Sequence, residues 1–505
     1  MTLLRESYLY HIWLAVLAAY RESALGRWME RLGDWCGRQI DGSVLLRPLC
    51  REGVVARSWE GSVLCRLLMF LANLPGELLH RLYRAFRATF EDSFFARLAF
   101  GLGEETAIAQ SWLITLLWVI PFQYWSNSYS LLGFTMLLIL FHAGAMRHER
   151  FRLDLGSMGF YPVLLLGSVF LGTVLSYSPA LSGRFLLYHI SAALCALLTV
   201  SAVRCEGDLK RLAAGGAVCV LVSSLYGVYQ RIQGVEVKRA YVDLSVNQGM
   251  PGRVESFFDN PNTYGEVLIL LLPLVLALVL CSRSLWGRLA SGAAFALGVA
   301  ALGMTYSRSS WVGFAAAMVV MVFLWRPRLL PAFAVACVVC VPLLPDTIWN
   351  RILTIGAGDR TATSRIPLWQ AAAAAIRLRP VRGAGLGTDT PRAFIKAFDL
   401  YHAAFPYVHA HNFFLEVWLE AGLLGLIGFT ASALWNIKRA ARAVRRCRDS
   451  AARTIAGGAA ASLCGILVCG LMDYPWHYPR VMCMFWFVFA MALAGTKLCL
   501  RERTD

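Results

Sequence analysis

Apolar runs of about twenty residues recur along this chain from residue 108 to its C-terminal end, and each is long enough to cross a bilayer as a helix. Only helices and closed barrels satisfy every backbone group in lipid. A barrel strand would alternate apolar and polar residues, whereas these runs are continuous. The composition agrees, because 58% of the 505 residues are hydrophobic and only 16% are charged. The sequence therefore predicts an all-α, polytopic integral membrane protein.

We predict about twelve transmembrane helices, and the charge of the short loops between them indicates their orientation. The expected spans cover residues 108–125, 130–146, 160–177, 184–203, 212–230, 262–281, 289–305, 309–325, 329–345, 410–437, 455–473 and 481–499. The stretch 438–453 carries seven basic residues, whereas short loops on the other side carry at most one each. The positive-inside rule then places both termini in the cytoplasm. Two long extracytoplasmic loops remain, at residues 231–261 and 346–408.

Residues 1–107 differ from the predicted membrane domain at residues 108–500. They mix 13 Arg with 12 acidic residues, and no run among them looks long enough to cross a membrane. Leucines from Leu67 to Leu82 recur at helical spacing, with arginines between them. We expect a cytoplasmic extension, either an amphipathic helix on the inner membrane surface or a small helical hairpin.

The net charge of +17 points to anionic partners. No nucleic-acid-binding motif is apparent, so membrane lipid and phosphorylated substrates are the expected partners. Arg308 lies in a turn of about three residues between two spans, where an arginine is costly unless it meets an anion. Arg253 and Arg365 lie in the two long loops. Because guanidinium binds phosphate bidentately and stays charged, three such residues would suit a diphosphate. Contact with lipid headgroups, or ion pairs within the loops, is the alternative.

His411 begins span ten at the predicted membrane boundary on the extracytoplasmic side. An imidazole there can be neutral at ambient pH and accept a proton from a sugar hydroxyl. Asn412 beside it can donate hydrogen bonds to a polar substrate. Asp473 and His477, which follow span eleven, could orient His411. The alternative is a histidine that merely caps the helix.

Two patterns could indicate a metal or redox site, and we predict neither. His402, His409, His411 and His477 fall near the outer face, but a spacing of two residues does not place two ligands on one helix face. Cys337 and Cys340 form a CxxC inside an apolar span, where small core residues are expected. We therefore expect no metal and no cofactor.

Two further features have open interpretations. The run GAGLGT at 383–388 invites a nucleotide-binding interpretation, but no strand precedes it, and a turn that closes the outer loop is favoured. Glu416 and Glu420 lie one helical turn apart within span ten. Acidic residues inside a membrane are candidates for function, but these could equally pair with arginine or line the bundle interior.

The stretch His411-Asn412, nine residues, Gly422, two residues, Gly425 resembles the HNx9GxxG pattern of the O-antigen ligase family, also called the Wzy C-terminal family. Three other stretches resemble that family in the same order: RVESFFDNPNTYGE at 253–266, YSRSSWVGF at 306–314, and SRIPLW at 364–369 followed by RGAGLGT at 382–388. The resemblance covers roughly residues 210–435, and the first 107 residues lie outside it.

This resemblance implies a GT-C-like membrane glycosyltransferase that needs neither metal nor ATP. Its donor would be a glycan on a polyprenyl diphosphate, and its acceptor a sugar hydroxyl on a saccharide or glycolipid, as in an O-antigen ligase or a polysaccharide polymerase. By likeness, His411 would activate the acceptor, and Arg253, Arg308 and Arg365 would hold the diphosphate. Gly422 and Gly425 are small enough to let another helix approach and hold His411 in place. The alternative function is a non-enzymatic transporter or flippase of lipid-linked glycans, but no internal repeat is apparent.

Overall fold

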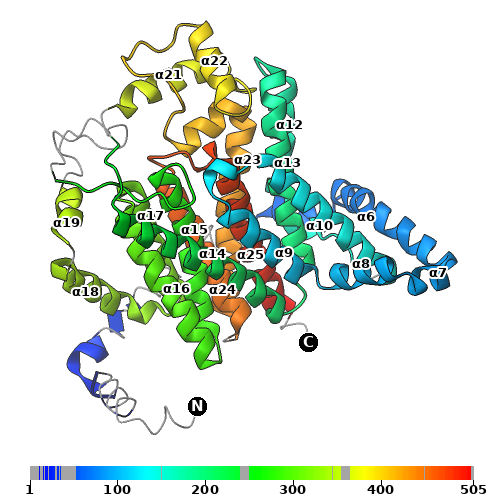
Figure 1. Cartoon of the computed structure of the whole chain (residues 1–505), viewed down its shortest axis with the longest axis horizontal. Helices are drawn as coiled ribbons and strands as arrows, with labels where there is room; N and C mark the ends of the chain where they lie inside the picture. The colour runs from blue at the N-terminus through cyan, green and yellow to red at the C-terminus, as the bar shows by residue number, and fades with distance from the viewer. Residues whose placement is uncertain are drawn as a thin grey trace.

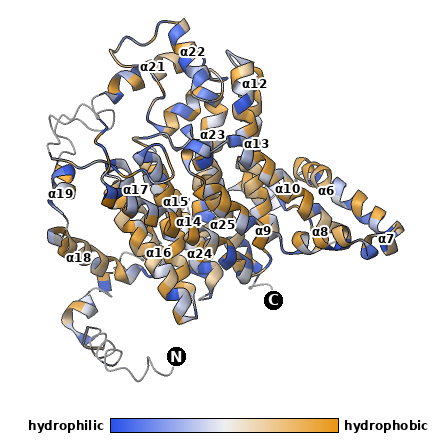
Figure 2. Cartoon of the chain, in the orientation of Figure 1, coloured by the Kyte–Doolittle hydropathy of each residue, from blue (hydrophilic) through white to orange (hydrophobic). Residues whose placement is uncertain are grey.

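The structure is a computed structural model that describes residues 53–148, 151–238, 249–343, 345–353, 364–448 and 450–501, with scattered positions between residues 11 and 35. Throughout this described part the chain forms helices and no strand, which confirms the all-α class (Figure 1). Figure 2 shows that hydrophobic residues dominate the helices of the central bundle, as expected for a protein that crosses a membrane several times.

Ten helices of the described chain are long and apolar enough to cross a membrane. They are α6 (Val63–Ala85), α10 (Asn127–Arg147), α13 (Pro179–Ala202), α14 (Glu206–Gln233), α15 (Pro261–Cys281), α16 (Leu285–Met304), α17 (Arg308–Trp325), α23 (Phe413–Arg446), α24 (Ala451–Cys469) and α25 (Pro479–Arg501). Three shorter apolar helices are α9 (Thr106–Val119), α12 (Phe160–Val174) and α18 (Leu330–Cys340).

Nine of the twelve predicted spans coincide with helices of this length, and three are shorter than predicted. The spans at 108–125, 160–177 and 329–345 correspond to α9, α12 and α18. Two prolines explain part of the difference, because Pro121 follows the end of α9 and Pro342 lies in the 3-10 turn that follows α18. Cys337 and Cys340 both lie exposed on α18.

The expectation that residues 1–107 contain no run long enough to cross a membrane is wrong for α6. Its 23 residues meet the length and composition of a span. Arginines interrupt its leucines, so the sequence shows no continuous apolar run there even though the helix as a whole is apolar. α6 packs against α10, and Asn73 on its buried face bonds both backbone polar groups of Leu153. Its location at the inner membrane surface stays a prediction.

The core of the bundle forms around α24 and α25. α25 is buried along almost its whole length and packs against α13, α23 and α24. Alanines and glycines dominate the buried face of α24, which packs closely against α15 and α17. Small residues permit this close approach between membrane helices.

A second, smaller core belongs to the loop lobe, which we define as α21 (Arg365–Leu378), α22 (Asp389–Ala397) and the turn between them. This lobe lies at the end of the bundle where α23 begins (Figure 1). Leu368 of α21 and Phe394 of α22 share an apolar cluster with Leu419 of α23. α21 ends at Leu378, two residues before Pro380, a residue that cannot continue a helix.

The loop lobe joins the bundle at a break in α23. Gly422 has φ 71° and ψ −174°, a conformation that only glycine adopts readily, and it interrupts the helical hydrogen bonds. The loop lobe satisfies the groups that this break leaves free. Leu419 O accepts from Ala384 N–H at 2.6 Å, Glu420 O from Gly385 N–H at 3.2 Å, and Leu423 N–H donates to Pro380 O at 3.0 Å.

This junction corrects the predicted role of Gly422. A Cβ atom there would lie 1.9 Å from Val381 O, so the close neighbour is the loop lobe and not another helix. Gly425 does face α12, but Ser168 Cβ of that helix is only at ordinary contact distance, 3.9 Å. The junction also supports the loop-closing interpretation of GAGLGT, because its amides bond α23 and Ser182 Oγ rather than facing a free space.

Candidate active site

A cavity of about 470 Å³ lies where the loop lobe meets the bundle. Its walls come from both predicted extracytoplasmic loops, 231–261 and 346–408, and from the segment that follows α24. His411, Arg253, Arg308 and Arg365 all line it. The structure therefore brings together four residues that the sequence separates by up to 158 positions (411 − 253).

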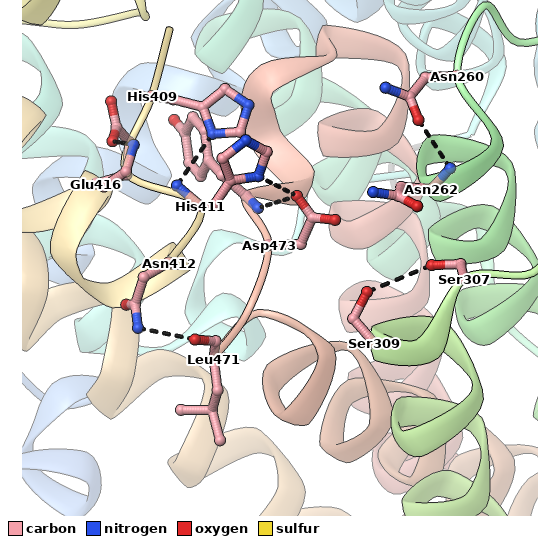
Figure 3. Close-up of polar contacts among 12 residues, drawn as sticks. Asn260, Asn262, Ser307, Ser309, His409, His411, Asn412, Glu416, Leu471 and Asp473 are labelled. Atoms are coloured by element: carbon pink, nitrogen blue, oxygen red, sulfur yellow. Dashed lines mark hydrogen bonds and ion pairs between the residues drawn. The ribbon is translucent and has the colours of Figure 1, made fainter. Parts of the chain in front are cut away.

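The imidazole of His411 is held in place by the carboxylate of Asp473. Its Nδ1 atom lies 3.1 Å from Asp473 Oδ1, and its backbone N–H donates to His409 Nδ1 at 3.2 Å (Figure 3). A carboxylate partner fixes the proton on Nδ1 and leaves the Nε2 lone pair available. Within the described chain Nε2 has no hydrogen-bond partner, and the side chain is 32% exposed in the cavity wall. The imidazole is therefore oriented as a proton acceptor.

Asp473 is nearly buried but stays ionised. Burial by itself would raise the pKa of this carboxyl, but the hydrogen bond and charge of His411, with the charge of Arg365, hold its pKa below the usual value. Asp473 Oδ1 also accepts the Tyr474 N–H at 3.0 Å. The predicted orienting contact between Asp473 and His411 thus exists in the structure.

His409 and His477 form a neutral layer beside His411. The ring centroids of His409 and His411 are 4.0 Å apart, and those of His409 and His477 are 4.8 Å apart. Burial, reinforced by the charge of His411, lowers the pKa of His477 to about 4 and lowers that of His409 as well. His402 is exposed near Asp399 and does not line the cavity. In the described ranges no three His, Cys, Asp or Glu residues are arranged to hold a metal ion.

Three helices present their N-termini to the same cavity. Asn262 belongs to the first turn of α15, Arg308 is the first residue of α17, and Arg365 is the first residue of α21. The N-terminus of a helix carries unsatisfied N–H groups and a partial positive charge, which together favour anions. The turn of three residues predicted around Arg308 is confirmed, because α16 ends at Met304 and α17 begins at Arg308.

Arg253 and Arg365 are positioned in the cavity wall by different contacts. Arg253 is 8% exposed, its Nε donates to Thr305 O at 2.7 Å, and it also donates to Asn262 Oδ1. Arg365 lies close enough for its charge to act on both Asp473 and His409. A wall of this sign, which lies beside an imidazole whose Nε2 faces the cavity without a protein partner in the described chain, suits a ligand whose anionic part adjoins an uncharged part.

Two residues that were not predicted from the sequence also line the cavity. Arg351, on α19 (Asp346–Leu353), is 4% exposed and lines the cavity as a fourth arginine. Glu266, on the second turn of α15, is 2% exposed and also lines it. The sequence contains a signal for Glu266, because an isolated acidic residue in an apolar span is a candidate for function. Arg351 was indistinguishable from the other arginines of its loop.

The remaining predicted residues support the site without lining the cavity. Asn412 caps α23 by accepting the N–H groups of Phe414 and Leu415 at 3.1 and 3.0 Å, and it donates to Leu471 O at 3.0 Å. Its amide is thus engaged in the protein rather than directed at a substrate. Glu416 accepts the Ala410 N–H at 2.7 Å and Glu420 accepts the Tyr474 hydroxyl at 2.7 Å, so both acids fix segments that carry the histidines.

The chain is also similar in sequence to known proteins. Residues 293–430 match the family model described as O-Antigen ligase. The chain is also similar to the exopolysaccharide production protein ExoQ of Rhizobium meliloti (strain 1021), with 26% identity over 271 residues. This alignment covers 50% of the present chain and 59% of the relative. The matched family region includes Arg308, Arg351, Arg365 and His411. Residues 293–430 are therefore similar to the O-antigen ligase family, and the ten long apolar helices indicate a multi-pass membrane protein.

Proposed function

We propose that this protein is a glycosyltransferase that moves a glycan from a polyprenyl diphosphate to a sugar hydroxyl at the extracytoplasmic face of the cell membrane. The observation that carries the proposal is the cavity itself. It combines arginines and three helix N-termini on its walls with an imidazole that is oriented by a buried carboxylate. The family and the similarity to an exopolysaccharide production protein support polysaccharide assembly as the biological context.

The diphosphate of the donor would bind to the cationic wall. Arg253, Arg308, Arg351 and Arg365 can neutralise its charge, and charge-assisted bonds to guanidinium are among the stronger hydrogen bonds in proteins. The same groups stabilise the charge that develops on the diphosphate as it departs. The cleaved sugar–phosphate bond supplies the driving force, so the reaction needs no ATP.

His411 would act on the acceptor. Its Nε2 takes the proton of the acceptor hydroxyl while the hydroxyl oxygen attacks the anomeric carbon of the donor sugar. The bond from that carbon to the diphosphate oxygen breaks, and polyprenyl diphosphate leaves with its electron pair. Asp473 then stabilises the imidazolium that forms. A single displacement of this kind inverts the configuration at the anomeric carbon.

The decisive experiment is reconstitution of the purified protein in liposomes with a polyprenyl-diphosphate oligosaccharide and candidate acceptors, in the presence of EDTA and without ATP. We expect a glycosylated acceptor and free polyprenyl diphosphate in equal amounts. The length of the product separates single ligation from polymerisation. Movement of the intact donor across the bilayer without any product would instead favour a flippase.

His411→Ala tests the proposed base. We expect this variant to lose transfer while it inserts into the membrane and unfolds at the same temperature as the native protein. His402→Ala is the matched control, because His402 is exposed and lies outside the cavity. Native turnover by the His411 variant would remove the catalytic role.

A further inference from the structure

A second cavity of about 490 Å³ lies at the end of the bundle opposite the candidate active site. It runs between the first turns of α14 and α16 and includes the last turn of α15. α15 begins at the candidate active site and α16 ends there, so the last turn of α15 and the first turn of α16 lie at the far end. We call this cavity the α14–α16 groove.

Alanines form much of the groove. Ala217 of α14 and Ala294 of α16 are 8% and 2% exposed and form its floor, and Ala214 and Ala290 lie nearer its mouth. Val218 of α14, beside them, is 43% exposed. Short side chains on two facing helices leave a slot that larger residues would fill. Because its walls are mainly apolar, such a slot in a membrane protein favours hydrocarbon over water.

The mouth of the groove is cationic. Lys210, Arg211 and Arg283 line it, and no acidic residue does. Arg211 is neutralised by Asp208 at 3.1 Å, but Lys210 and Arg283 form no ion pair or hydrogen bond with the part of the chain that the structure describes. α16 also begins at the mouth, capped by Ser284, whose Oγ accepts the Gly287 N–H at 3.0 Å. Two unneutralised cations and a helix N-terminus thus adjoin an apolar slot.

We propose that the α14–α16 groove binds an anionic phospholipid, with its phosphate between Lys210 and Arg283 and one acyl chain along the alanine floor. The occupant follows from charge complementarity. Zwitterionic phospholipids carry the same chains, so only a net negative headgroup gains from the unneutralised cations at the mouth. The site is independent of the proposed transferase activity and lies at the opposite end of the bundle.

Native mass spectrometry of the full chain in detergent tests this site with phosphatidylglycerol and phosphatidylcholine that carry identical acyl chains. We expect wild-type protein to retain phosphatidylglycerol strongly and phosphatidylcholine weakly. The double variant Lys210→Gln/Arg283→Gln should lose about tenfold or more of its phosphatidylglycerol affinity, since each surface cation contributes about fivefold. Arg326→Gln, at the same end of the bundle but outside the groove, is the charge control and should retain the lipid.

A second variant tests the slot without altering charge. Ala294→Leu fills the floor and should abolish retention of phosphatidylglycerol, whereas Ala296→Leu, exposed on the same helix outside the groove, should leave it intact. Equal retention of the two lipids by wild-type protein would overturn the proposal, as would full retention by the double variant. Displacement of phosphatidylglycerol by equimolar polyprenyl phosphate would assign the groove to the carrier lipid and would also refute it. Thermal unfolding identifies a variant that fails to fold.

Discussion

Replacement of Asp473 by Asn separates orientation of His411 from stabilisation of its charge. The carboxylate lies 3.1 Å from His411 Nδ1 and is nearly buried, at 5% exposure. Asn can still accept a hydrogen bond from Nδ1–H, but it carries no charge to stabilise the imidazolium that forms when the acceptor proton is taken. A hydrogen bond to a charged group contributes about 1.5–3 kcal/mol, of which a neutral bond retains part.

Because the neutral bond retains about 0.5–1.5 kcal/mol, the loss of transition-state stabilisation is about 1–1.5 kcal/mol, which corresponds to a roughly 5- to 13-fold lower kcat. Because the effect arises only as the proton moves, KM for the lipid-linked donor should change little. The assay is initial-rate kinetics in liposomes with a lipid-linked oligosaccharide and a fluorescent acceptor. Asp473→Glu should recover part of the rate, since it restores the charge.

Asp389→Asn is the matched control, because Asp389 is a surface acid of the loop lobe that pairs with Arg392 and lies outside the cavity. The reasoning is refuted if Asp473→Asn retains kcat within about twofold of the native value. A rise in KM with unchanged kcat would likewise show that Asp473 contributes to binding and not to the proton transfer.

Three further predictions concern the arginine wall, the helix break and the histidine layer. Arg308→Lys should lower the transfer rate at least tenfold, because an ammonium cannot form the paired bonds of a guanidinium. Arg326→Lys is its control. Equal transfer rates for the two variants would indicate that Arg308 only contacts lipid headgroups. Gly422→Ala should lower the free energy of unfolding by about 2–6 kcal/mol, because alanine avoids this backbone conformation and its Cβ would clash with Val381 O. Thermal unfolding measures the loss, with Gly167→Ala as the control, since a Cβ at Gly167 would meet nothing within 4 Å. The stability of the native protein should fall as the pH drops from about 6.5 to about 4, by up to about 3 kcal/mol from His477, because the unfolded chain binds the proton that the buried imidazole resists. His477→Gln should make the unfolding temperature less dependent on pH across that window, and an unchanged pH dependence would contradict the assignment.

The sequence predicted several residues that line the cavity, but it did not predict how the cavity is built. His411 and the three predicted arginines could be chosen because their types and expected membrane depth restrict what they can do. Hydrophobic periodicity does not show a helix break, so the interruption at Gly422 was hidden within an apolar run. Arg351 could not be distinguished either, since its selection depends on how α19 packs beside the cavity and not on its local sequence.

The ends of the membrane helices could also not be predicted well from the sequence. An apolar run of about twenty residues predicts a helix that fills the bilayer, but α9 and α12 end after 14 and 15 residues. Side-chain composition alone cannot distinguish a helix that spans the bilayer from one that stops inside a protein core, because both present apolar surface.

The junction at Gly422 also bears on how freely the surface of the loop lobe can vary. Three of the hydrogen bonds that attach the loop lobe to α23 join main-chain groups on both sides. Peptide amides and carbonyls are common to nearly all residues, so substitutions on the exposed surface of the lobe leave this attachment unchanged. The exposed surface of the lobe can therefore vary while the main-chain attachment that places Arg365 in the cavity wall is kept.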